Sequence, residues 1–253
     1  MKTSFRSFFG KKKTLDPMTV TYPEAFSFFT DRREQYIESA SVLSKFVESG
    51  DDFIDVGANI GFFSLEFMKK IDFKGHAYLF EPVPNLAKLC SYTFADLPYN
   101  VSINPYALGD IDGVATIYTA DDGNIGWNTL VSAKVSHGMQ KLEIETRRFD
   151  SLGIELGSVG AIKIDVEGGE YQVLSGMLPS LEQSTRLPAL LVEVGWGGVH
   201  PFWEKELDVF SRLAGLGYST FNPDGTRIDV TYIKETRDVL FIPDRLLALC
   251  SVK

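Results

Sequence analysis

The stretch FIDVGANIGFF, residues Phe53 to Phe63, decides how the chain folds. An apolar run leads through Asp55 into two glycines, Gly57 and Gly61, and a second apolar run follows. This pattern predicts a strand, a tight turn and a helix. Glycines allow a positive φ and let a ligand approach the backbone, and the first N–H groups of a helix point into the same space. The turn is therefore a candidate nucleotide-binding loop.

The charge of this turn favours a cationic ligand over a pyrophosphate. A dinucleotide fingerprint reads G-x-G-x-x-G, whereas here the spacing is G-x-x-x-G and Asp55 stands two residues before Gly57. S-adenosylmethionine carries an ammonium and a sulfonium and has no phosphate, so Asp55 and the open turn suit its methionine end.

A second acidic residue follows the next predicted strand. Residues 78–82 read as a strand that ends in Glu81, and a carboxylate at that place can accept both ribose hydroxyl protons. Asp-x-Gly turns occur in many α/β proteins, and Glu81 alone also suits a solvated strand end or a helix N-cap. The turn, the spacing and Glu81 together favour a cofactor site.

Composition narrows the class of protein and of partner. The chain has 253 residues, 44% of them hydrophobic and 23% charged, as in an ordinary soluble globular domain. A formal net charge of −9 argues against a broad nucleic-acid interface and favours a small-molecule partner. Two cysteines, Cys90 and Cys250, do not make a disulfide framework. No apolar run is long enough to span a membrane and no signal peptide is evident, so a cytoplasmic protein is expected. The oligomeric state stays open.

Strands and helices alternate along most of the chain, which predicts a doubly wound, mostly parallel sheet with its site at the carboxyl ends of the strands. We expect residues 1–50 to form a tail and a helical leader, and residues 51–253 a single domain. Residues 112–150 alternate at period two and predict a β-rich insertion. Further strands are expected at 101–104, 161–166 and 190–194, and 218–221 with 239–242 as an antiparallel pair.

Polar residues recur where the predicted strands end, so the parallel-sheet rule places them on one rim. They are Asp55, Glu81, Asn104, Asp165 and Glu193. The turn after Asn104, with Ala107, could border an adenine ring. Trp127 and Trp196 lie in glycine-rich loops and could stack on a substrate or simply pack in the fold.

Methyl transfer from a sulfonium to an alcohol requires a group that removes the hydroxyl proton. Asp165, Glu193 and His200 are the candidate bases. Each has a structural alternative, since Asp165 could only orient the cofactor and His200 could lie in an exposed loop. The cluster of Asp165, Glu167, Glu193 and His200 could also ligate a divalent cation such as Mg²⁺, since hard oxygens suit that ion, but its spacing matches no known metal motif and no metal site is assigned.

Four segments together resemble the FkbM family of S-adenosylmethionine-dependent methyltransferases over roughly residues 36–222. They are DVGANIG at 55–61, FEP at 80–82, ALGD at 107–110, and KIDVEG at 163–168 followed by Glu170. The resemblance implies a class I methyltransferase, Rossmann-like fold, in which a seven-stranded sheet ends in an antiparallel strand. It also implies O-methylation of a small molecule such as a polyketide or a sugar-containing product.

The resemblance also implies roles for individual residues. Asp55, Gly57 and Asn59 would face the methionine end of the cofactor in the turn that Gly61 closes. Glu81 would bind the ribose, 104–107 would border the adenine, and Asp165 would sit beside the transferred methyl. Two other functions stay open: a nicotinamide-dependent oxidoreductase, which the missing third glycine disfavours, and a non-catalytic module that binds the cofactor.

Overall fold

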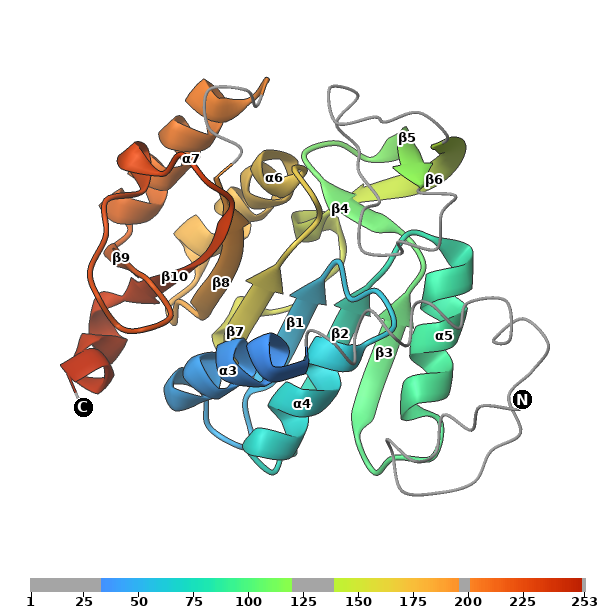
Figure 1. Ribbon diagram of the computed structural model, residues 1–253, viewed down its shortest axis with the longest axis horizontal. Helices are drawn as coiled ribbons and strands as arrows, with labels where there is room; N and C mark the ends of the chain where they lie inside the picture. The colour runs from blue at the N-terminus through green and yellow to red at the C-terminus, as the bar shows by residue number, and fades with distance from the viewer. Residues whose placement is uncertain (1–32, 120–138, 196–200, 252–253) are drawn as a thin grey trace.

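The computed structural model describes residues 33–119, 139–195 and 201–251, which form a seven-stranded sheet, a smaller sheet and covering helices (Figure 1). The large sheet has the order β3-β2-β1-β7-β8-β10-β9. Its strands are β1 (Asp52–Val56), β2 (His76–Phe80), β3 (Asn100–Asn104), β7 (Val159–Ile164), β8 (Ala189–Val194), β9 (Tyr218–Phe221) and β10 (Arg237–Pro243). β10 runs antiparallel to both of its neighbours, while the other pairings are parallel. This is the class I methyltransferase sheet that the sequence predicts.

Helices cover both faces of the sheet because the strands alternate apolar side chains between them. Ile54 and Val56 of β1 belong to the core beneath α6 (Glu170–Gln183) and α7 (Trp203–Gly215). Phe53 of the same strand belongs to the core beneath α3 (Arg33–Leu43), α4 (Phe62–Lys70) and α5 (Pro84–Phe94). Figure 1 shows α3 and α4 in front of the sheet. The described part of the leader is thus helical, and it continues into the short helix η2 (Ser44–Phe46).

A second sheet lies beside the carboxyl end of the first and contains β4 (Ala107–Gly109), β5 (Gly113–Thr119) and β6 (Gln140–Arg148) in the order β4-β6-β5. The sequence predicts a turn over 105–110 and a β-rich segment that begins at residue 112. The predicted turn is wrong at 107–109, where the chain forms β4. Ala107 and its neighbours extend because they pair with β6. Gly109 also packs closely on α6, where a Cβ at Gly176 would lie 2.0 Å from its carbonyl oxygen.

The turn at 165–169 joins β7 to α6 and carries Asp165. α6 contains Pro179 and still continues to Gln183, because Leu178 and Leu181 on either side of the proline are fully buried. β7 ends at Ile164, so Asp165 lies just after the strand, in the turn that leads to α6. Within the described ranges, none of the helices has the length and apolar character needed to cross a membrane.

Candidate active site

The glycine turn after β1 is shaped by its neighbours within the fold. Gly57 and Gly61 have φ values of 81° and 79°, and Asn59 between them has a φ of 52°. A Cβ at Gly57 would lie 1.9 Å from the backbone carbonyl oxygen of Asp165. The absent side chain therefore lets the turn lie directly against the end of β7. The first glycine serves chain packing at least as much as ligand approach.

Glu81 holds this turn from the neighbouring strand end. Its Oε2 accepts a hydrogen bond from the backbone N–H of Asn59 at 2.9 Å, and its Oε1 accepts one from Val83 at 2.8 Å. The side chain is 5% exposed, and this burial raises the pKa of the carboxyl to about 7. A carboxylate oxygen that accepts one hydrogen bond keeps a second lone pair, so the expected ribose contact is compatible with this geometry and stays a prediction.

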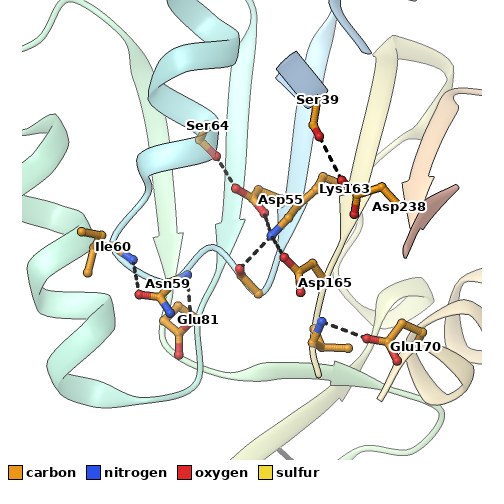
Figure 2. A network of polar contacts seen from close by, with 12 residues as sticks. Ser39, Asp55, Asn59, Ile60, Ser64, Glu81, Lys163, Asp165, Glu170 and Asp238 are labelled. Atoms are coloured by element: carbon orange, nitrogen blue, oxygen red, sulfur yellow. Dashed lines mark hydrogen bonds and ion pairs between the residues drawn. The ribbon is translucent and has the colours of Figure 1, made fainter. Parts of the chain in front are cut away.

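Asp55 and Lys163 form a buried ion pair beneath the turn (Figure 2). They are directly opposite each other on β1 and β7, and their side chains are 0% and 7% exposed. Asp55 Oδ2 accepts a hydrogen bond from Ser64 Oγ of α4 at 2.5 Å, and its Oδ1 lies 3.3 Å from Lys163 Nζ. Burial raises the pKa of Asp55, and Lys163 and Ser64 oppose that rise. The protein thus encloses this carboxylate, and its expected contact with the methionine end stays a prediction.

Lys163 has two further partners, both at the rim. Its Nζ donates to the carbonyl oxygen of Gly57 at 3.0 Å and lies 3.3 Å from Asp165 Oδ2. Burial by itself would lower the pKa of Lys163, but the carboxylates of Asp165 and Asp55 raise it above its usual range. The lysine is therefore a fixed positive charge beside the turn.

Three carboxyl groups meet at the ends of β7 and β8. One oxygen each of Asp165, Glu167 and Glu193 lies within 4.8 Å of the others. Burial raises the pKa of Glu193 to about 10, and the charges of Asp165, Glu167 and Glu170 add to the rise. This raised pKa makes Glu193 less suited to act as a base than an ordinary carboxylate. The Asp165 side chain, which is 30% exposed and ion-paired, has the better position for proton removal.

Oxygen ligands of this kind suit a hard cation such as Mg²⁺, but three clustered carboxylates do not by themselves define a metal site.

Glu170 has a structural role. Its Oε1 accepts hydrogen bonds from the backbone N–H groups of Val166 and Gly168 at 3.1 and 3.0 Å, which closes the turn before α6.

The side chains expected around the adenine make contacts within the protein. Asn104 donates from Nδ2 to the carbonyl oxygen of Leu79 at 3.2 Å, and its Oδ1 accepts from the Tyr106 hydroxyl at 3.2 Å. The Ala107 side chain is buried in the small core of the second sheet. An adenine contact by Ala107 would therefore use its backbone. The predicted base His200, together with Trp127 and Trp196, lies outside the described residues.

The sequence gives only weak signals for some residues of this network. Lys163 interrupts the apolar run Ala161 to Val166, and a charged residue inside such a run indicates a buried, paired side chain. Asp238 of β10 lies opposite Glu193 and accepts a hydrogen bond from Ser39 of α3 at 2.9 Å. Because its partner lies 199 residues away in the chain, no local pattern could indicate that contact.

A family model described as "Methyltransferase FkbM domain" matches residues 55–220. A search of curated proteins found no match.

Solved structures of methyltransferases also match. They include the O-methyltransferase TomG of Streptomyces achromogenes in complex with S-adenosylmethionine (11% identity, TM-score 0.46, 94% of each chain covered). An rRNA methylase of Streptococcus thermophilus has 10% identity and a TM-score of 0.46, over 81% of this chain and 94% of that one. An S-adenosylmethionine-dependent methyltransferase of Aquifex aeolicus has 12% identity and a TM-score of 0.43, over 89% and 92%.

Proposed function

The chain belongs to the FkbM methyltransferase family, and we propose that it moves a methyl group from S-adenosylmethionine to a hydroxyl oxygen of a small molecule. The observation that carries the proposal is the contact between the glycine turn and the end of β7. Gly57 lies against the backbone of Asp165, so a cofactor held by the turn would present its methyl group close to that carboxylate.

The reaction needs few protein groups. The bond between the methyl carbon and sulfur breaks while a bond to the acceptor oxygen forms, and the hydroxyl proton passes to a base. The products are S-adenosylhomocysteine and a methyl ether. Positioning of the two reactants can supply roughly 7–11 kcal/mol, and a general base typically contributes about 10²- to 10⁴-fold. We assign the base to Asp165, since its partly exposed side chain lies at the rim beside the turn, whereas burial and the neighbouring carboxylates raise the pKa of Glu193.

The acceptor class rests on charge and on the family. A formal charge of −9 opposes binding to a nucleic-acid backbone, so we propose a neutral, hydroxylated molecule such as a sugar, glycan or polyketide-like product. Both cysteines are free thiols, which agrees with the cytoplasmic location that we propose from the sequence. Family membership assigns the chain to the methyltransferases rather than to the nicotinamide oxidoreductases.

Calorimetric titration tests the cofactor first. We expect micromolar binding of S-adenosylhomocysteine and no binding of NAD in a parallel titration. Binding of NAD alone would refute the proposal, and binding of neither would favour a non-catalytic interaction protein.

A screen of hydroxylated acceptors, followed by mass spectrometry, then tests the transfer. It is run with Mg²⁺ and with a chelator, because Asp165, Glu167 and Glu193 could recruit the ion. We expect Asp165→Asn to lower kcat by about 10²- to 10⁴-fold while S-adenosylhomocysteine still binds. An unchanged kcat would exclude Asp165 as the base. Tight, salt-sensitive binding of RNA in a filter assay would overturn the acceptor class.

A further inference from the structure

Lys163 connects three separate segments through one ammonium group. Its Nζ lies 3.3 Å from Asp55 Oδ1 on β1 and 3.3 Å from Asp165 Oδ2 after β7, and it donates to the Gly57 carbonyl oxygen in the turn at 3.0 Å. Figure 2 shows the lysine at the centre of these contacts. The contact with Gly57 is a hydrogen bond and the contacts with the two carboxylates are ion pairs, so one cation joins the two strand ends and the turn.

A buried ion pair often does no more than maintain a fold, so the partners of Lys163 must be compared. The Asp55 carboxylate is fully buried and belongs to the core beneath α4. The other two acceptors belong to the rim: Gly57 is in the proposed cofactor turn, and Asp165 carries the proposed base. A lysine needed only to neutralise Asp55 would not have to reach either of them.

We propose that Lys163 is a positioning residue for methyl transfer, which ties the cofactor turn to Asp165 and so fixes the distance between the cofactor and the base. The inference rests on the proposed function for the identity of the cofactor. The lysine does not touch the reacting atoms; it acts through the Gly57 carbonyl and the Asp165 carboxylate. Its charge also favours the ionised form of Glu81, the residue expected to bind the ribose.

The effect on Glu81 supplies a measurement that a lysine whose charge does not reach the rim would not change. The groups that act on the Glu81 carboxyl, whose pKa is about 7, are the backbone N–H groups of Val83 and Asn59 and the charges of Lys163 and Asp55. Affinity for S-adenosylhomocysteine should therefore rise with pH through a midpoint near 7 in the unaltered protein. Loss of the lysine charge should move this midpoint to higher pH.

The experiment is calorimetric titration with S-adenosylhomocysteine between pH 5.5 and 8.5, together with urea unfolding of each variant. Lys163→Met keeps an unbranched chain and removes the charge. We expect it to weaken binding at pH 8 by at least about tenfold, the usual order for loss of a hydrogen bond from a charged group, and to raise the midpoint. Lys74→Met is the matched control, because Lys74 is exposed and pairs at the surface with Asp72.

Lys163→Met leaves the Asp55 carboxylate without its cation, which can unfold the protein. The double variant Lys163→Met/Asp55→Asn removes that unpaired charge and should fold, and we expect weakened binding relative to Asp55→Asn alone, with a smaller shift of the midpoint because loss of the Asp55 charge by itself lowers the pKa of Glu81. Either folded variant with unaltered affinity and midpoint would overturn the proposal while leaving the cofactor assignment intact. Failure of the unaltered protein to bind S-adenosylhomocysteine would instead refute the proposed function and this inference with it.

Discussion

Replacing Glu81 with glutamine removes a carboxyl that is costly to ionise in the folded protein. Its pKa is about 7 in the fold, against an ordinary value of 4.5, because the side chain is buried. Between these two pH values the folded state binds more protons than the unfolded state, so stability falls as pH rises. The difference of about 2.5 units between the two pKa values corresponds to roughly 3 kcal/mol of stability, and this stabilisation is fully lost only above pH 7.

The assay is urea unfolding of both proteins at pH 5 and pH 8. Because part of the titration lies below pH 5, we expect the unaltered protein to lose about 2–3 kcal/mol more than Glu81→Gln between these two pH values. Other buried acids contribute to the pH dependence of both proteins and cancel in the comparison. The glutamine amide also cannot accept from both Asn59 and Val83, a cost that does not depend on pH.

Glu143→Gln, at an exposed position of β6, is the control and should keep the pH dependence of the unaltered protein. If Glu81→Gln shows the same loss of stability between pH 5 and pH 8 as the unaltered protein, the buried, proton-holding carboxyl inferred here does not exist.

Three further substitutions test the packing and the charges of the site. Gly57→Ala should lower the free energy of unfolding in urea by at least about 2 kcal/mol, since φ is 81° and the new Cβ would meet a backbone oxygen at 1.9 Å. The control is Gly225→Ala, where φ is 86° but the space around the new Cβ is open, and it should cost only about 1–2 kcal/mol. Ser64→Ala removes the hydrogen bond to the buried Asp55 carboxylate and should cost about 1–3 kcal/mol, and an unchanged denaturation midpoint would contradict that bond. Because the pKa of Glu193 is raised from 4.5 to about 10, Glu193→Gln should show a smaller fall in stability between pH 5 and pH 9 than the unaltered protein, and equal slopes in the two proteins would refute the raised pKa.

Local sequence was sufficient for most of the large sheet. Apolar runs of four to six residues separated by helical segments predict its strands, because a strand buried on both faces has to be apolar throughout. The turn at Gly57 comes directly after one predicted strand and Glu81 comes at the end of the next. Their place on one rim could therefore be inferred before the structure was known. The predicted antiparallel pair of 218–221 with 239–242 is confirmed as β9 and β10.

Tertiary structure decided what the polar groups do. Asp55 is enclosed by Ser64 and Lys163, which come from α4 and from a strand about one hundred residues later. The distance between Gly57 and the Asp165 backbone depends on how β1 and β7 align, and β4 exists only because β6 pairs with it. Composition and periodicity report which side chains avoid water, whereas the charge state of a carboxyl depends on groups brought beside it by folding. The sequence therefore predicted the sheet and the rim, and only the folded chain decided which acid is buried against a lysine, which has a raised pKa and which lies partly exposed at the rim.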